Sequence, residues 1–313
     1  MVDKIARTES KVLCYGGIVI ESIIVLPYQP KPGIAHIICE EHFRIGGGAA
    51  NVAEWLGSWS VPTRLSGTVI GYDHYGDQIW NWLSDYSAID LQYVMRQNEV
   101  PTLIARSIPF PDGNKYLFCS DFAKALYVPP TQEMLNNVQA LEIAFYYRNP
   151  NGNAASAELA KFAYAKGIKI VAMDVVSTSH ETLPLADIII NSAASIIEQY
   201  PRVNILEYSK ALQSVSKGIV ITTDGDERIT AIDQDGTFSF LSPPKVLVTD
   251  TTGAGDSFRA GIIYGYLEGW SLTRSLRWAT AVGALQAQRD LSQAAPPTKN
   301  EIADLAHQIK VHS

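Results

Sequence analysis

The chain has 313 residues, of which 47% are hydrophobic, and carries a formal net charge of −7 at pH 7. This length and apolar content suffice for one large domain with a well-buried core. The negative charge, without a local Lys/Arg cluster to offset it, argues against nucleic acid as a partner. A small anionic ligand is compatible, because a helix N-terminus and a few basic side chains can bind phosphate inside an acidic protein.

The sequence also limits the compartment. No apolar stretch approaches the roughly 20 residues that a membrane-spanning helix needs, and residues 1–11 lack the basic, apolar and small-residue succession of a secretory signal. Cys14, Cys39 and Cys119 are widely spaced and form no C-x-x-C pair, so neither disulfides nor a structural zinc site is supported. We expect a cytoplasmic protein without a membrane partner.

Short apolar runs of buried-strand type alternate with helix-like patterns along most of the chain. The strand candidates are, in order, 12–15, 64–69, 143–147, 168–173, 186–191 and 218–223. The helix candidates between them are 50–59, 77–86, 153–166 and 206–216. Such alternation favours a mostly parallel sheet with helices on both faces. We expect an α/β, doubly wound architecture.

Two segments interrupt the alternation, at about 21–45 and 94–122, with turn signals at Lys31-Pro-Gly33 and Pro111-Asp-Gly-Asn114. They predict a small β-sheet that projects from the main body. Such a sheet could act as a lid over a site at the carboxyl ends of the parallel strands, or consist of surface hairpins without a moving role. Its open edges would suit a homodimer contact. We treat residues 1–313 as one unit.

A glycine-rich motif, Asp250-Thr-Thr-Gly-Ala-Gly-Asp256, lies between a strand expected at 245–249 and a helix expected from Ser257 onward. Three of its residues have little or no side chain: Gly253, Ala254 and Gly255. Their backbone amides can approach a ligand closely at the positive end of the helix dipole. The motif therefore predicts an anion site, such as one for a phosphoryl group in transfer.

Asp256 has two interpretations at this position. Beside an anion site, its carboxylate can act as a general base that accepts the proton of an attacking hydroxyl. Alternatively, it is the N-cap of the helix, a position that Asp favours because its side chain bonds free amides. A second motif is needed to choose between them.

A second glycine cluster, Ile45-Gly-Gly-Gly-Ala-Ala-Asn51, opens the helix expected at 50–59. Its small residues allow close backbone approach, and the Asn51 amide can both donate to and accept from a hydroxyl. It matches neither the P-loop pattern nor the dinucleotide-binding Gly-x-Gly-x-x-Gly pattern. Alone, it is equally compatible with an ordinary tight turn.

Together, the two motifs resemble those of the PfkB-type carbohydrate kinases, the ribokinase-like family. The resemblance covers most of the chain. It implies a ribokinase-like fold, ATP and Mg²⁺ as cofactors, and a small sugar-like substrate whose pocket is lined by Gly47, Gly48 and Asn51. It also implies an anion hole at 253–255 with Asp256 as the catalytic base, which favours catalysis over the cap interpretation.

Other segments are similar to those of the family. Thr223-Asp-Gly225 resembles the turn that helps to hold the nucleotide, and Asn191 resembles an asparagine near hydrated magnesium. Asp250 resembles an aspartate near a monovalent-cation loop, such as one for K⁺, although a turn-forming Asp is an equal alternative. Arg148 lies near a position that contacts sugar in some members, or else is a solvated residue at the end of a strand.

Three departures from the family pattern concern substrate and metal. Many members have Asp where this chain has Glu21, which moves a substrate-binding carboxylate outward. After Asn191, an acid is expected, but this chain has Ser and Ala, and Glu198 lies too far along to be an obvious replacement. Arg228 stands where a glycine is expected after Gly225. The resemblance thus leaves both the substrate and the handling of Mg²⁺ open.

These observations predict an ATP-dependent phosphotransferase that acts on a hydroxyl of a sugar or sugar-like molecule. A nucleoside kinase of the same fold is an alternative within the class. A non-catalytic sensor of sugar or nucleotide is an alternative outside it, motivated by the missing acid after Asn191.

Overall fold

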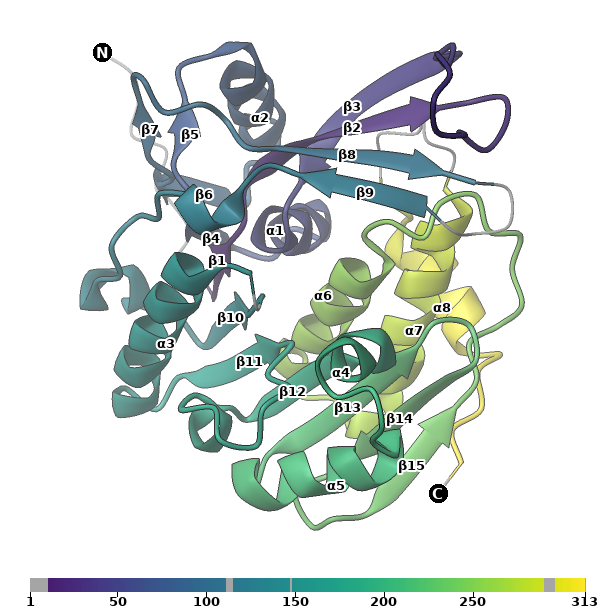
Figure 1. Ribbon diagram of the computed structural model, residues 1–313. Coiled ribbons are helices and arrows are strands. Elements are labelled where there is room, and N and C mark those ends of the chain that lie inside the picture. Colours follow the sequence, from purple (N-terminus) through teal and green to yellow (C-terminus); the bar gives the residue numbers. More distant parts are fainter. Residues whose placement is uncertain (1–10, 111–114, 147, 290–295, 313) are drawn as a thin grey trace.

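The structure of the protein is a computed structural model that describes residues 11–110, 115–146, 148–289 and 296–312. Its largest element is a nine-stranded sheet in the order β15-β14-β13-β12-β11-β10-β1-β4-β6 (Figure 1). The strands from β13 to β6 in this order run parallel, whereas β14 and β15 join one edge in antiparallel fashion. The strands are β1 (Val12–Gly16), β4 (Thr63–Gly67), β6 (Ile89–Tyr93), β10 (Ala140–Ala144), β11 (Lys169–Met173), β12 (Ile188–Ser192), β13 (Ile219–Asp224), β14 (Arg228–Ile232) and β15 (Phe238–Leu241).

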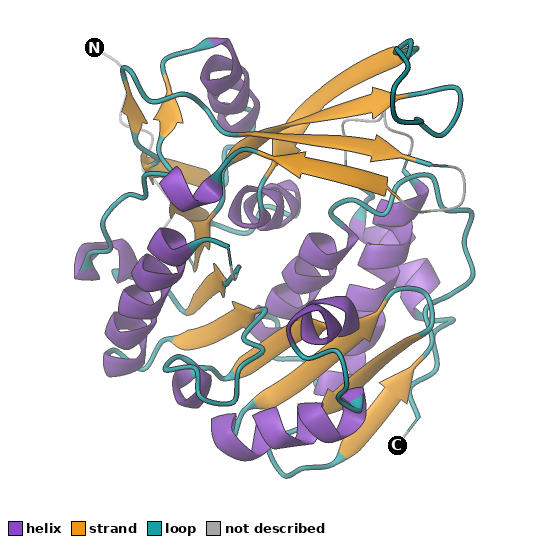
Figure 2. Ribbon diagram, in the orientation of Figure 1, coloured by secondary structure: helices purple, strands orange, loops and turns teal. Residues whose placement is uncertain are grey.

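Helices cover both faces of this sheet (Figure 2). Successive residues of a strand point to opposite faces, so Val12 and Cys14 of β1 pack into one hydrophobic core and Leu13 and Tyr15 into another. The helices are α1 (Gly48–Ser58), α2 (His74–Ser84), α3 (Pro150–Ala165), α4 (Ala193–Gln199), α5 (Ile205–Ser216), α6 (Ala254–Leu267), α7 (Leu272–Gln288) and α8 (Lys299–Ala306), with short 3-10 turns at Phe122–Lys124, Gln132–Leu135 and Leu183–Leu185. The expected α/β, mostly parallel architecture is confirmed.

A separate four-stranded sheet, here called the second sheet, has the order β3-β2-β8-β9. Its strands are β2 (Val19–Val25), β3 (Glu40–Gly46), β8 (Ile104–Pro109) and β9 (Lys115–Cys119). Figure 1 shows it projecting from the main body above α1 and α6. It arises from the two segments that interrupt the alternation, as expected, while the predicted turn at 111–114 lies outside the described residues. A two-stranded pair, β5 (Ile70–Gly71) and β7 (Arg96–Gln97), completes the strands that the structure describes.

Two strand predictions differ from the structure. The strand expected at 143–147 is present but begins at Ala140 and ends at Ala144. The charged Glu142 interrupts the apolar pattern, which placed the start of the strand after it, yet Glu142 is buried within β10. Tyr147 lies outside the described residues. Residues 245–249 form no strand: they follow Pro243-Pro244, and Leu247 is 84% exposed. The β14–β15 hairpin occupies the sheet edge instead.

The described residues contain no helix that is both long enough and apolar enough to cross a membrane.

Candidate active site

The late motif, Asp250–Asp256, leads directly into α6. Gly253 is the N-cap of this helix, with φ of 78°, a left-handed conformation that glycine adopts without steric cost. Asp256 lies inside the first turn, so the alternative interpretation of Asp256 as the N-cap is wrong. Its side chain is therefore available for contacts other than capping.

The first turn of α6 has no side-chain cap, which leaves backbone N–H groups at the positive end of the dipole. Gly255 is exposed. The Ala254 amide donates to the Thr251 carbonyl at 3.2 Å, a long bond within the turn. An anion at this helix end would thus meet the Gly255 amide most directly.

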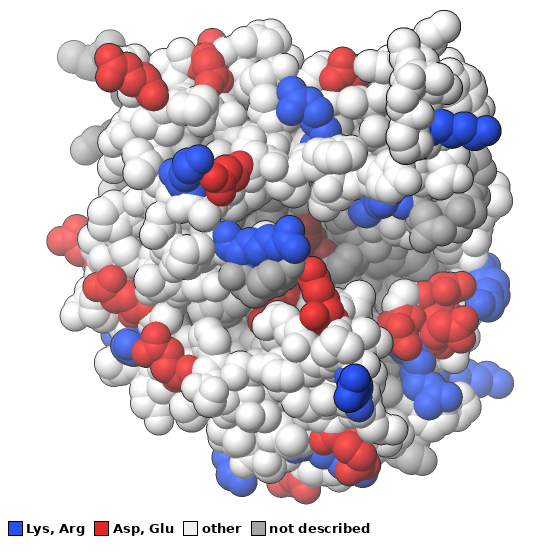
Figure 3. All heavy atoms as spheres, in the orientation of Figure 1, with Lys and Arg blue, Asp and Glu red and all other residues white. Residues whose placement is uncertain are grey.

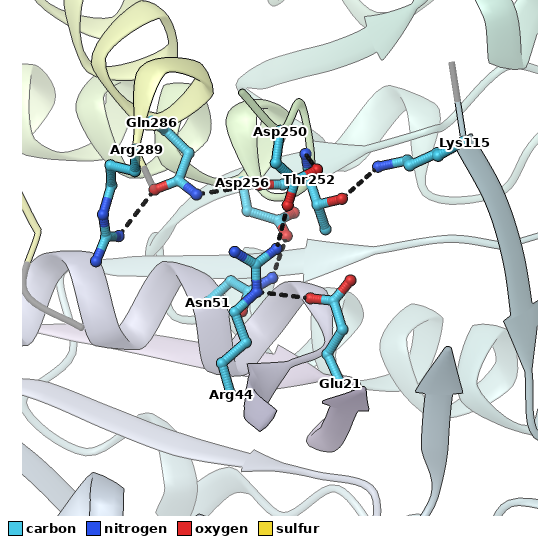
Figure 4. A network of polar contacts seen from close by, with 9 residues as sticks. All are labelled: Glu21, Arg44, Asn51, Lys115, Asp250, Thr252, Asp256, Gln286 and Arg289. Atoms are coloured by element: carbon cyan, nitrogen blue, oxygen red, sulfur yellow. Dashed lines mark hydrogen bonds and ion pairs between the residues drawn. The ribbon is translucent and has the colours of Figure 1, made fainter. Parts of the chain in front are cut away.

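The early motif, Ile45–Asn51, reaches the same place from a distant part of the chain. Gly47 is the N-cap of α1 and Gly48 its first residue. Asn51 lies in the first turn of α1, and its Nδ2 donates to Asp256 Oδ2 at 2.6 Å (Figure 4). The other carboxylate oxygen, Asp256 Oδ1, accepts from Arg259 Nη2 at 2.7 Å. Both oxygens of Asp256 are thereby held by side chains of different elements.

Glu21 lies on β2, near Asn51 and Asp256 (Figure 4). Arg44 of β3 is its direct cross-strand neighbour, and Arg44 Nε donates to Glu21 Oε2 at 2.9 Å. Arg44 Nη2 also donates to Asp250 Oδ2 at 3.2 Å, so one guanidinium joins two buried carboxylates (Figure 4). Burial raises the pKa of Glu21, although the Arg44 charge acts in the opposite direction. Arg44 was not identified from the sequence.

The segment around Asp250 is fixed from three sides. The Asp250 carboxylate accepts from the Thr252 amide at 2.9 Å, which is the turn-forming role considered for it. Lys115 of β9 donates to Thr252 Oγ1 at 2.7 Å, and Gln286 of α7 donates to the Thr252 carbonyl at 3.0 Å. Through Arg44 and Lys115, the second sheet therefore contacts the loop that precedes α6.

The remaining sequence candidates lie farther along the carboxyl edge of the sheet. Thr223 is near the end of β13, and Gly225 is exposed in the turn to β14 with φ of 50°. Arg148 is exposed just before α3.

Two buried oxygens at this edge lack a hydrogen-bond partner among the described residues: Asn191 Oδ1 at the end of β12 and Asp174 Oδ1 just after β11. Asp174 has φ of 57°, a strained conformation for a residue with a side chain. Burial raises its pKa despite hydrogen bonds from the Ser195 hydroxyl and the Ser192 backbone. Carboxylate and amide oxygens are ligands suited to Mg²⁺, so Asp174 and Asn191 fit the metal. Glu198, by contrast, is exposed on α4.

The described residues contain no group of three or more His, Cys, Asp or Glu side chains that could hold a metal ion. Mg²⁺ usually keeps several waters and takes only one or two carboxylates plus substrate phosphates. A site built from Asp174 and Asn191 would follow that pattern.

Figure 3 shows a hollow between the second sheet and the main body, with acidic and basic side chains along it.

Comparisons with known proteins address which chemistry this geometry serves. The sequence model described as pfkB family carbohydrate kinase matches residues 9–299. The chain belongs to the PfkB family of carbohydrate kinases. It is accordingly a phosphotransferase with an alcohol group as acceptor, as the motifs predicted.

Relatives of this PfkB-family kinase differ in their substrates. The chain is 26% identical to a nucleoside kinase of Methanothermobacter thermautotrophicus over 301 residues, which is 92% of this chain and 93% of the relative. It resembles an Arabidopsis thaliana ribokinase solved with ribose and ATP, with a TM-score of 0.77 and 21% identity over 96% of this chain and 99% of that one. A candidate Ribokinase II from Escherichia coli, solved with ATP and Mg²⁺, gives a TM-score of 0.80 and 18% identity over 96% and 99%. At these identities the two structures establish the shared fold.

The sequence did carry signals for the residues that were missed. Glu142 and Arg259 are charged residues inside otherwise apolar strand and helix patterns, and both are completely buried. Asp174 directly follows a buried strand, where the carboxyl edge of a parallel sheet presents its side chains. Arg44 carries no such signal, because its role depends on the register between β2 and β3.

Proposed function

We propose that the protein transfers the γ-phosphoryl group of ATP to a hydroxyl of a sugar or sugar-like molecule, with Asp256 as the general base. The observation that carries this proposal is the hydrogen bond from Asn51 to Asp256, which joins the two sequence motifs in one site. Asp256 has a side chain that is 18% exposed at the start of α6, so it can meet both a hydroxyl and an anion.

In the proposed reaction, the substrate oxygen forms a bond to the γ-phosphorus as the bond from that phosphorus to the bridging oxygen of ADP breaks. Asp256 accepts the hydroxyl proton. The backbone amides at 253–255 stabilise the negative charge on the transferring group, with Gly255 as the main donor. Most of the rate acceleration comes from positioning and charge stabilisation, because the transition state is loose.

Other residues would bind the reactants. We assign the sugar to the side of Asp256 that faces β2 and α1, and the nucleotide to the carboxyl ends of β12 and β13. The substrate contacts are Glu21, Gly47, Gly48, Asn51 and Arg148, and the nucleotide contacts are Asn191, Thr223 and Gly225. Asp174 and Asn191 would hold hydrated Mg²⁺, which supplies neutralisation of phosphate charge when it is bound. A K⁺ site near Asp250 stays a prediction from the family resemblance.

The second sheet is proposed to act as the lid. Arg44 of β3 and Lys115 of β9 link it to the Asp250–Thr252 segment, so movement of the sheet would change the surroundings of the substrate. Its β9 strand exposes Tyr116, Leu117 and Phe118, which supports a homodimer through the lid. Light scattering of the wild-type protein and of Leu117→Lys tests this contact: a monomeric wild type contradicts it.

An ADP-release screen tests the function. ATP and Mg²⁺ are supplied with D-ribose, other polyols, sugar acids and adenosine, each with and without K⁺. A sugar as the preferred acceptor supports the main proposal, and adenosine as the preferred acceptor supports the nucleoside kinase alternative that the Methanothermobacter relative suggests. Thermal stabilisation by these compounds without any ADP release would support the sensor interpretation.

A further inference from the structure

Arg259 is the largest side chain that is fully buried in the described structure. It lies on α6, three residues after Asp256, and its side chain is 0% exposed. Burial of a guanidinium is costly unless charged partners compensate for the lost water. The partners of Arg259 therefore indicate why a charge is placed here.

Arg259 has a carboxylate on each side. Its Nη2 donates to Asp256 Oδ1 at 2.7 Å. Its Nη1 lies 3.0 Å from Glu142 Oε1, an ion pair whose angle does not suit a hydrogen bond. Glu142 is also 0% exposed and belongs to β10, near the middle of the central sheet. The three residues form a charged chain from the core of the protein to the active site.

Space for this chain is provided by the early motif. A Cβ atom at Gly48 would lie 2.8 Å from Arg259 Nη2 and 3.5 Å from Asp256 Oδ1. A side chain there would displace the guanidinium from Asp256. Glycine at position 48 thus leaves the space that the Arg259 guanidinium occupies, and it also allows close backbone approach.

The arrangement serves more than stability. Buried ion pairs can often be replaced by well-packed apolar residues without loss of stability. Here, one end of the chain leaves the core: Asp256 reaches the site, with Asn51 on Oδ2 and Arg259 on Oδ1. A carboxylate held at both oxygens has one orientation from which to receive a proton, and orientation is a large part of the barrier.

We propose that Arg259 and Glu142 are positioning residues for catalysis: Glu142 fixes the Arg259 guanidinium, which holds Asp256 in the orientation that receives the hydroxyl proton. This inference rests on the proposed function, because it requires Asp256 to be the base. Glu142 lies on β10, so the Arg259 side of Asp256 is held from the central sheet, whereas Asn51 holds the other carboxylate oxygen from α1.

Glu142 adds a readout that a structural role would not change. Burial raises its pKa to about 7, with Arg259 acting in the opposite direction and Asp256 in the same one. Cys14 of β1 also faces this pair, with a thiol pKa raised by burial, and Asp174 interacts with Arg259. Ionised Glu142 shares the Arg259 charge with Asp256, whereas protonated Glu142 leaves that charge to Asp256 alone. We expect kcat to rise with pH through about 7 and Glu142→Gln to lack this step.

The test compares kcat and KM for the acceptor with the highest rate among D-ribose, sugar acids and adenosine. The double variant Glu142→Leu/Arg259→Met removes both charges together and replaces them with apolar side chains, a change that buried ion pairs often tolerate. We expect kcat of the double variant to fall about 100-fold, with the KM for the acceptor nearly unchanged. Arg64→Met, which breaks the Arg64–Asp90 ion pair outside the site, is the control and should keep the wild-type kcat.

Several outcomes would overturn the proposal. A folded double variant with wild-type kcat, or one in which only KM rises, excludes a positioning role. Should the double variant not fold, Arg259→Lys decides, because it keeps the charge but loses the two-sided fork: a kcat at least about tenfold lower supports the proposal, and an unchanged kcat contradicts it. Asp256→Asn is measured in the same assay. Turnover by Asp256→Asn refutes the proposed base itself, whereas an inactive Asp256→Asn beside a fully active double variant refutes only the positioning role.

Discussion

Asn51 and Asp256 are separated by 205 positions in the sequence, yet Asn51 Nδ2 lies 2.6 Å from Asp256 Oδ2. Each residue lies in the first turn of a helix that begins with a glycine N-cap, α1 for Asn51 and α6 for Asp256. These two helices pack against each other, so the contact depends on the core rather than on a flexible loop.

Asn51→Ala should lower kcat by about tenfold to 100-fold, because Asp256 loses one of its two orienting donors. Steady-state ADP release measures this change. Asn204→Ala removes the N-cap of α5, far from the site, and should lower stability by about 1 kcal/mol while kcat stays at the wild-type level. If Asn51→Ala also kept the wild-type kcat, the hydrogen bond would have no role in turnover.

Arg44→Met should destabilise the protein and raise the KM for the acceptor. Glu21 and Asp250 are 3% and 4% exposed and would lose their shared cation. Because the Arg44 side chain is itself 23% exposed, solvent screening limits the expected loss to about 1–3 kcal/mol. Urea unfolding measures the loss. Lys210→Met, which breaks an exposed pair with Glu207, should leave stability unchanged, and an equal effect of the two variants would contradict a special role for Arg44.

Glu142 should make stability depend on pH. Its pKa rises from an ordinary value of 4.5 to about 7 on folding, so the folded protein binds a proton that the unfolded chain has lost over this window. The contribution is complete below about pH 4.5 and disappears as pH rises through about 7, a change of about 3 kcal/mol. Urea unfolding of the wild type and Glu142→Gln at several pH values isolates this residue. A difference between them that is constant with pH would refute the shifted pKa.

Asp174→Asn should raise the Mg²⁺ concentration for half-maximal activity about tenfold or more, because it removes the carboxylate proposed to organise the hydrated ion. ADP release against free Mg²⁺ at saturating ATP measures the shift. Asp304→Asn, an equal charge change at an exposed position of α8, is the matched control. An unchanged Mg²⁺ requirement in Asp174→Asn would remove Asp174 from the proposed metal site.

Local patterns account for the parts of the fold and site that were predictable. Alternating apolar runs predicted the central sheet, and the small residues 253–255 before an amphipathic segment predicted the start of α6. Helix starts are encoded within a few residues, so the position of Asp256 in the first turn of α6 could be anticipated. The second sheet followed from segments that break the alternation.

Contacts that depend on register and burial were not predictable in the same way. The Glu21–Arg44 pair exists because β2 and β3 align in a particular register, and its link to Asp250 requires the second sheet to meet the loop before α6. The search for apolar runs placed the start of β10 after Glu142, because an isolated charge in a buried strand is unfavourable unless a partner neutralises it. That partner, Arg259, lies more than 100 residues away. At 245–249 the apolar run was real, but Pro243-Pro244 and the β14–β15 hairpin exclude it from the sheet.

Turnover by Asp256→Asn with the best acceptor, ATP and Mg²⁺ tests most directly whether Asp256 is the general base; its thermal unfolding and ATP binding are measured alongside. Asn keeps the shape of the side chain but cannot accept the hydroxyl proton as a carboxylate does. We expect kcat to fall by about 100-fold to 10,000-fold while the fold and ATP affinity are nearly unchanged. A folded Asp256→Asn protein with near wild-type kcat would exclude Asp256 as the general base.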